Sequence, residues 1–202
     1  MFTGIIQEVG TIARVERSKG LVRLTIYAPK TASRVGPVES VAVNGVCLSV
    51  IGVRDGAISF ELIPETQRLT SLGALRSGAR VNLEPSLLIS DRLNGHLVFG
   101  HVDGVGRVIE RRQRPGELVL KIRVAPELRK LLIPKGPVAL DGVSLTIGQT
   151  VGASTFTVHL IPETLRRTTL PSHGLGSRVN VELDYVAKLL WHVTRERAGL
   201  RR

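Results

Sequence analysis

Side chains suited to nucleophilic and proton-transfer chemistry lie in short stretches that the sequence contains twice. Cys47 lies in "NGVCLSV", and Ser144 lies in the matching "DGVSLTI", so each stretch offers a thiol or a hydroxyl nucleophile. Asp141 opens the second stretch, and His101 lies in "GHVDGVG". A histidine can transfer protons near neutral pH. The pattern indicates two related sites with different reactive groups.

The two copies differ at the positions where chemistry would occur. The first copy has Ile5, Asn44, Cys47 and Ser49 where the second has His101, Asp141, Ser144 and Thr146. Taken alone, a single cysteine is usually a small buried apolar residue, and a single histidine is usually just hydrogen-bonded. Four differences inside the most repeated blocks favour another interpretation, in which two similar pockets hold similar ligands and treat them differently.

The repeat extends over most of the chain. Four blocks recur in the same order: Gly4 matches Gly100 (offset 96), Asn44 matches Asp141 (97), Leu62 matches Leu160 (98) and Ala79 matches Ser177 (98). An offset that drifts by one residue at a time indicates a duplicated domain with small loop changes. A period of this length is too long for a solenoid unit, so each copy is expected to be a complete small domain.

The local pattern within each copy predicts strands. "VRLTIYA", "AISFELI", "ELVLKIRVA" and "STFTVHLI" alternate or carry β-branched residues, and Gly, Pro, Asn or Asp separate them. Each copy is therefore expected to be an all-β barrel or sandwich. We place the domains at residues 1–95 and 96–183, divided in the polar stretch "ISDRLNGH".

Helices are expected at a few places. Proline suits a first helical turn in "PETQRLTSL" and "PETLRRTTL", and "PELRKLLI" from Pro126 is another candidate. Residues 184–202 follow both copies, with Asp184 as an N-cap and an apolar stripe at helical spacing. This final helix either lies on its own domain or pairs with other chains, and we favour an oligomerisation helix.

The phrase "LIPET" occurs at Leu62 and again at Leu160. Its glutamate and threonine could satisfy backbone donors around a helix start. They could equally line a ligand site, and the two interpretations are compatible.

Composition narrows the function classes. The chain has 202 residues, 43% of them hydrophobic, and no apolar run of the ~18 residues that a membrane span needs. The N-terminus has no signal-peptide pattern, so we expect a cytoplasmic protein without membrane association. One cysteine makes neither a disulfide nor a thiolate metal site. The net charge is +11, but the basic residues are scattered along the chain and only 3% of residues are aromatic. Both observations argue against a nucleic-acid partner.

Five motifs in the same order resemble the riboflavin synthase family. They are "MFTGII", "NGVCLSV", "GHLVFGHVDGVG", "DGVSLT" and "HLIPETLRRTTL", and together they span nearly the whole chain. The resemblance implies two homologous six-stranded Greek-key β-barrels with a C-terminal α-helix. It also implies a homotrimer, with each active site between the first barrel of one subunit and the second barrel of its neighbour.

The resemblance further implies the reaction and its partners. Two molecules of 6,7-dimethyl-8-ribityllumazine, both bound in one active site, would dismutate to riboflavin and 5-amino-6-(D-ribitylamino)uracil by transfer of a four-carbon unit. The reaction would need no cofactor and no metal. Two identical substrates suit two copied pockets, and a donor and an acceptor require unequal treatment.

Carried over by motif, the resemblance implies a set of substrate-binding residues. In the first copy these are Phe2, Gly4, Ile5, Ile6, Cys47, Leu48, Ser49, Glu61, Leu62, Ile63, Pro64, Glu65 and Thr66. In the second they are Gly100, His101, Val102, Lys135, Ser144, Leu145, Thr146, His159, Leu160, Ile161, Pro162, Glu163 and Thr164. Phe2 would cover the pocket, which requires an ordered N-terminus. Ser49 departs from the family, which often has Thr there, but keeps the hydroxyl.

Catalytic roles follow from the chemistry that the resemblance implies. His101 is the candidate for proton transfer from the acidic C7 methyl group. Cys47 or Ser144, or water that they hold, could supply the nucleophile, while Asp141 and Asp184 could orient or assist. Which pocket holds the donor stays open.

Two rival functions are weighed against the enzyme. A non-catalytic lumazine- or flavin-binding protein of the same fold would keep a pocket but lose catalytic side chains, and here all of them are present. A flavoprotein reductase would need a nucleotide-binding domain, for which the chain has neither room nor a G-x-G-x-x-G motif.

Overall fold

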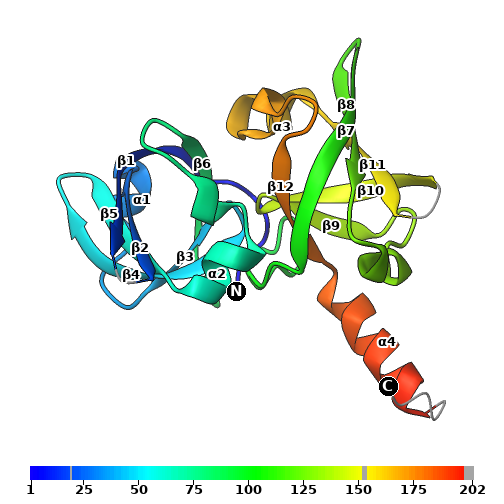
Figure 1. The fold of residues 1–202 in the computed structure, drawn as a ribbon, viewed down its shortest axis with the longest axis horizontal. Coiled ribbons are helices and arrows are strands. Elements are labelled where there is room, and N and C mark those ends of the chain that lie inside the picture. The colour runs from blue at the N-terminus through cyan, green and yellow to red at the C-terminus, as the bar shows by residue number, and fades with distance from the viewer. Residues whose placement is uncertain (19, 152–153, 198–202) are drawn as a thin grey trace.

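The computed structural model describes residues 1–18, 20–151 and 154–197 as two closed six-stranded barrels followed by a helix (Figure 1). The first barrel contains β1 (Glu8–Ser18), β2 (Leu21–Tyr27), β3 (Ser40–Val43), β4 (Val46–Arg54), β5 (Ala57–Leu62) and β6 (Arg80–Pro85). The second contains β7 (Gly104–Arg114), β8 (Glu117–Arg123), β9 (Pro137–Leu140), β10 (Val143–Val151), β11 (Thr155–Leu160) and β12 (Arg178–Leu183). The predicted all-β class and the four predicted strands are confirmed.

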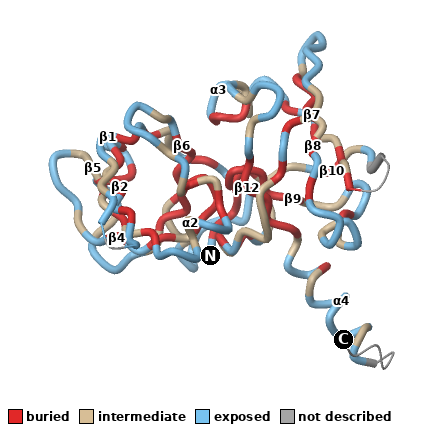
Figure 2. The backbone as a smooth tube through the Cα atoms, viewed as in Figure 1, coloured by how far each residue is buried: buried red, intermediate tan, exposed pale blue. Residues whose placement is uncertain are grey.

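The two barrels have the same topology. Around the first barrel the order is β1-β2-β5-β4-β3-β6, and around the second it is β7-β8-β11-β10-β9-β12, with antiparallel pairing throughout. In β5 every second side chain is buried, as expected for a strand with one face on the core. Each barrel has its own apolar core, which includes Phe60 in the first and Phe156 in the second. Buried backbone, red in Figure 2, occurs in both barrels. Duplication of sequence has therefore produced duplication of fold.

Short helices connect the strands. They are α1 (Pro29–Ala32), α2 (Pro64–Leu69), α3 (Pro162–Arg167) and the 3-10 helices η1 (Leu72–Ala74), η2 (Pro126–Leu131) and η3 (Leu170–Ser172). The three helical candidates that begin at prolines are confirmed. The capping interpretation of "LIPET" is wrong, because neither the start of α2 nor that of α3 has a side-chain cap hydrogen bond. The N-cap residues are Ile63 and Ile161, which have no polar side chain to accept from the first helical turn.

Helix α4 (Tyr185–Arg197) extends away from the second barrel (Figure 1). The Asp184 carboxylate accepts a hydrogen bond of 3.2 Å from the Val186 N–H, which confirms the predicted N-cap. The predicted apolar stripe is exposed, since Val186, Leu189 and Leu190 keep 51%, 51% and 61% of their accessible surface. Residues 198–202 of the predicted tail domain lie outside the described residues.

Paired turns join the two barrels. Asn44–Gly45 and Asp141–Gly142 both adopt positive φ, as tight hairpin turns require, and the two glycines lie against each other. The Asn82 side chain donates to the Asp141 carbonyl at 2.9 Å, and Asn180 donates to the Asn44 carbonyl at 2.8 Å. The contacts repeat with the roles of the barrels exchanged, so the interface has approximate twofold symmetry.

Candidate functional site

A hollow of about 330 Å³ on the second barrel brings together many of the predicted substrate-binding residues. It is lined by Lys135, Ser144, Leu145, Thr146, Ile147, Gly148, His159, Ile161 and Thr164. These residues come from β10, from the end of β11, from the start of α3 and from the turn before β9. The "LIPET" phrase thus contributes to the wall of a concave site that combines hydroxyl, amine and apolar groups, the usual make-up of a small-molecule pocket.

Ser144 lies at the edge of this hollow with its hydroxyl engaged. Its Oγ is 2.7 Å from Nδ1 of His96, which is close enough for a strong hydrogen bond. Its backbone N–H donates to the Gly4 carbonyl at 2.8 Å. The spacing of the hydroxyl and the imidazole suits a nucleophile–base pair, with the hydroxyl as donor when the proton of the neutral ring is on Nε2.

His96 is the functional candidate that sequence reasoning missed. It lies in the segment between the barrels, outside the repeat, and the only sequence signal was its place in the motif "GHLVFGHVDGVG", whose second histidine, His101, was predicted instead. Burial lowers the pKa of His96 below its ordinary value, although the nearby Asp184 carboxylate acts in the opposite direction. Burial thus favours the neutral ring, which can accept a proton from Ser144 in the tautomer that carries its own proton on Nε2.

Cys47 occupies the corresponding place on β4 of the first barrel. It is half-buried, and its N–H donates to the Gly100 carbonyl at 3.0 Å. The side chain packs against a small apolar cluster between the barrels, which consists of Phe2, Ala42, Val98 and Ala139. The backbone N–H of each nucleophile candidate therefore donates to a glycine carbonyl from the other copy of the repeat in the same chain.

The ordered N-terminus pairs with the segment between the barrels. Phe2 and Val98 exchange backbone hydrogen bonds of 2.7 and 3.1 Å, and the Phe2 ring is fully buried. The ring thus lies beside Cys47 within the interface between the barrels.

The remaining catalytic candidates are spread around the interface. His101 follows Gly100 and is exposed, with its ring 6.2 Å from that of Phe99. Asp184 is half-buried at the start of α4. Asp141 is almost fully buried at the turn between the barrels, where its carboxylate accepts from the Asn180 N–H and pairs with His173 at 2.8 Å. Asp184 thus lies near His96. The carboxylate of Asp141 is instead bonded to Asn180 and His173 beside the turn.

Two buried glutamates hold the predicted glycine segments. Glu84 on β6 accepts from the N–H groups of Thr3 and Gly4, and Glu182 on β12 accepts from those of Phe99 and Gly100. Burial raises the pKa of both carboxyl groups, although these hydrogen bonds oppose the rise. The only sequence signal for either residue is the repeat of "NLE" as "NVE".

Several predicted residues carry ion pairs on the surface. Glu61 pairs with Arg23 at 2.7 Å, and Glu163 pairs with both Arg166 and Arg167. These hydrogen bonds hold the pKa of Glu163 below its usual range. Such exposed pairs contribute little to stability.

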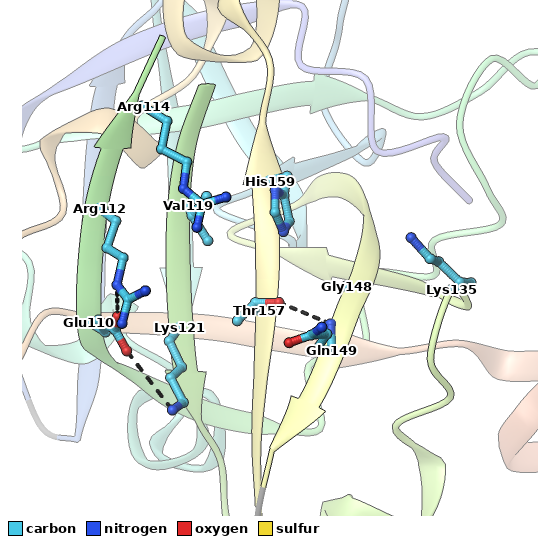
Figure 3. Close-up of a pocket in the computed structure, with 10 residues that line it drawn as sticks. All are labelled: Glu110, Arg112, Arg114, Val119, Lys121, Lys135, Gly148, Gln149, Thr157 and His159. Atoms are coloured by element: carbon cyan, nitrogen blue, oxygen red, sulfur yellow. Dashed lines mark hydrogen bonds and ion pairs between the residues drawn. The ribbon is translucent and has the colours of Figure 1, made fainter. Parts of the chain in front are cut away.

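A second hollow of about 560 Å³ shares Lys135, Gly148 and His159 with the first (Figure 3). Arg112, Arg114 and Lys121 project into it from β7 and β8. His159 binds Glu117 at 2.7 Å, which lowers the pKa of that carboxyl group. Lys135 has a left-handed backbone with φ of 65°, and it stands between the two hollows. Glu110 also lines the second hollow and pairs with Arg112 and Lys121, so the second-barrel site opens onto a surface with an excess of basic side chains.

Two further findings concern the described part of the chain. Within residues 1–18, 20–151 and 154–197, no cluster of three or more His, Cys, Asp or Glu side chains could hold a metal ion. The helices in those ranges are all too short or too polar to cross a membrane.

Comparisons with known proteins give matches that extend over both barrels. The family model described as lumazine binding domain matches residues 3–86 and 99–184. The riboflavin synthase of Bacillus amyloliquefaciens is 39% identical, with 95% of this chain and 88% of that protein covered. That of Mycobacterium tuberculosis strain H37Rv is 40% identical, with 96% and 98% covered.

Solved structures show the same architecture. LumP complexed with riboflavin superposes with a TM-score of 0.85 at 24% identity, covering 91% of this chain and 100% of that one. LumP complexed with 6,7-dimethyl-8-(1'-D-ribityl) lumazine gives 0.82 at 25% identity, covering 91% and 99%. Two barrels in tandem are thus the shared scaffold.

Proposed function

Because this chain belongs to the riboflavin synthase family of duplicated lumazine-binding domains, we propose that it is a riboflavin synthase. Two molecules of 6,7-dimethyl-8-ribityllumazine dismutate, and one transfers a four-carbon unit to the other. The products are riboflavin and 5-amino-6-(D-ribitylamino)uracil, which together contain all atoms of the two substrates. The observation that carries the proposal is the match to enzymes of this name over both barrels, with 88% and 98% of their lengths covered.

The hollow on the second barrel is the proposed binding place of one substrate. Hydroxyls of Thr146 and Thr164 and the amine of Lys135 suit a polyhydroxylated ribityl chain, while Leu145 and Ile161 suit the flat ring system. The copied strands of the first barrel, including Leu48 and Ser49 on β4, hold the second substrate.

The reaction needs a proton acceptor and a nucleophile at the meeting point of the two rings. Ser144, with its hydroxyl bound to the neutral His96, provides the nucleophile or holds the water that acts as one. His101 takes the proton from the acidic C7 methyl group, and Cys47 provides the unequal counterpart in the first copy. Holding two rings face to face contributes about 7–11 kcal/mol at best, so single replacements of side chains lower the rate only partly.

The assembly completes the proposed site. We expect a homotrimer joined through the exposed apolar side chains of α4, such as Leu189 and Leu190, because isolated apolar stripes of this kind mark protein interfaces. In that arrangement the first barrel of one subunit faces the second barrel of its neighbour. The domain limits 1–95, 96–183 and 184–202, the Greek-key description and the cytoplasmic location belong to the same proposal.

A change of spectrum tests the function directly. Purified protein mixed with 6,7-dimethyl-8-ribityllumazine, without added metal or redox cofactor, is expected to generate riboflavin fluorescence. Chromatography of the mixture should show the pyrimidine product in equal amount. If the lumazine binds and its spectrum stays unchanged, the protein is a binding protein and the proposed activity is wrong.

A further inference from the structure

Glu84 and Glu182 occupy the same place in the two barrels and make the same contacts. Glu84 is 4% exposed, and its carboxylate accepts from the Thr3 N–H at 2.7 Å and the Gly4 N–H at 2.9 Å. Glu182 is 3% exposed and accepts from Phe99 and Gly100 at the same two distances. A carboxylate buried this deeply is maintained only where its hydrogen bonds are satisfied.

The segments that these glutamates hold cross to the opposite barrel. We name residues 3–6 the first strap and residues 99–102 the second strap. Ile6 of the first strap is buried in the core of the second barrel, whereas Val102 of the second strap packs against the core of the first. Each glutamate therefore fixes a segment whose far end belongs to the other barrel.

Each strap lies directly on the reactive side chain of the barrel to which it crosses. The Gly4 carbonyl accepts from the Ser144 N–H, and the Gly100 carbonyl accepts from the Cys47 N–H. A Cβ added to Gly4 would lie 2.6 Å from Cβ of Ser144, and one added to Gly100 would lie 2.6 Å from Cβ of Cys47. Each strap is in close contact with the residue that it crosses. A shift of the strap would therefore also shift the backbone of Ser144 or Cys47.

We propose that Glu84 and Glu182 are positioning residues that act across the interface: Glu84 fixes the first strap over Ser144, and Glu182 fixes the second strap over Cys47. Each copy of the repeat thereby controls the reactive group of the other copy. The clamps are unequal, because the Thr3 hydroxyl gives Glu84 a third hydrogen bond of 2.7 Å, while Phe99 has no hydroxyl to offer Glu182. The consequence for turnover rests on the proposed function, but the coupling itself does not.

Cys47 is the only cysteine of the chain, so its reactivity toward an aromatic disulfide reports on the second strap without any turnover. In Glu182→Gln one of the two N–H groups, that of Phe99 or that of Gly100, meets an amide donor instead of an acceptor. We expect the modification rate of Cys47 to rise about tenfold, the change that follows from losing a charge-assisted hydrogen bond. Glu84→Gln should leave the rate within about twofold of wild type and lower kcat instead.

Glu8→Gln is the matched control, because Glu8 also accepts from two backbone N–H groups, those of Lys30 and Thr31, and neither belongs to a strap. It should change neither Cys47 reactivity nor kcat. Equal rates in Glu182→Gln and Glu8→Gln, or an equal rise in Glu84→Gln, would overturn the crossed arrangement. A protein without synthase activity would refute the proposed function, whereas the Cys47 result would still decide the coupling.

If Glu182→Gln does not fold, amide hydrogen exchange of the wild-type protein tests the coupling between each strap and the residue that it crosses. The Gly100 and Cys47 amides are linked through the second strap, so they should exchange in the same opening event. The Gly4 and Ser144 amides should exchange together in a different event. Independent exchange within either pair would contradict the proposal.

Discussion

Replacing Gly4 by alanine tests the contact between the first strap and Ser144. Gly4 has φ of 76°, where an L-residue costs about 1–2 kcal/mol, and the new Cβ would lie 2.6 Å from Cβ and 2.7 Å from the backbone nitrogen of Ser144. The strap must move to relieve these contacts. Gly78→Ala is the matched control, because Gly78 has φ of 86° and nothing within 4 Å of a new Cβ.

The difference between the two variants isolates the contact. Overpacking costs about 1–3 kcal/mol, and leaving the N–H of the half-buried Ser144 without the Gly4 carbonyl costs about 1–3 kcal/mol more. We therefore expect Gly4→Ala to lose about 2–6 kcal/mol beyond the loss in Gly78→Ala. Urea unfolding followed by circular dichroism should show this as a midpoint lower by about 1 M or more. Midpoints within about 0.2 M of each other would refute the reasoning, since that is the scatter of ordinary surface changes.

Three further predictions concern the site and the assembly. Cys47→Ala or Ser144→Ala should lower kcat more than it weakens substrate binding, and steady-state kinetics with equal losses in both would contradict the assigned roles. The pKa of His96 is lower in the folded protein than in the unfolded chain. Between the folded pKa and the unfolded value of about 6.5, the unfolded chain therefore binds a proton that the native state does not. Urea titrations should show the unfolding free energy of wild type rising with pH across this window relative to His96→Gln, and parallel curves would refute it. Deletion of residues from Asp184 onward should convert trimer to monomer, and an unchanged mass by light scattering would count against the role of α4.

The fold could be predicted from the sequence because its evidence is local or repeated. Alternation in "AISFELI" predicts a strand with one buried face, and the drifting offset from Gly4 to Gly100 predicts two copies of one domain. Proline at position 64 marks a helix start for the same local reason. Such signals are independent of how distant parts of the chain meet.

The site could be predicted only in part, because its chemistry depends on contacts between distant segments. Ser144 was identifiable from its repeat, but its partner His96 lies in an unrepeated segment and reaches it only through the fold. The hydrogen bonds of Glu84 join it to Thr3 and Gly4, which lie 81 and 80 positions earlier in the chain. A periodic sequence pattern does not predict contacts over such separations. Asp141 resembles a catalytic carboxylate in sequence, yet the structure engages it in the turn between the barrels.

The stoichiometry of the reaction tests the account most directly. Purified wild-type protein is incubated with 6,7-dimethyl-8-ribityllumazine, and substrate and both products are quantified by chromatography over time. We predict that two lumazine molecules disappear for each riboflavin formed, with one pyrimidine product released alongside it. Binding of lumazine with no riboflavin formed, or riboflavin formed without the pyrimidine, would contradict an enzyme built from two unequal copies of one binding domain.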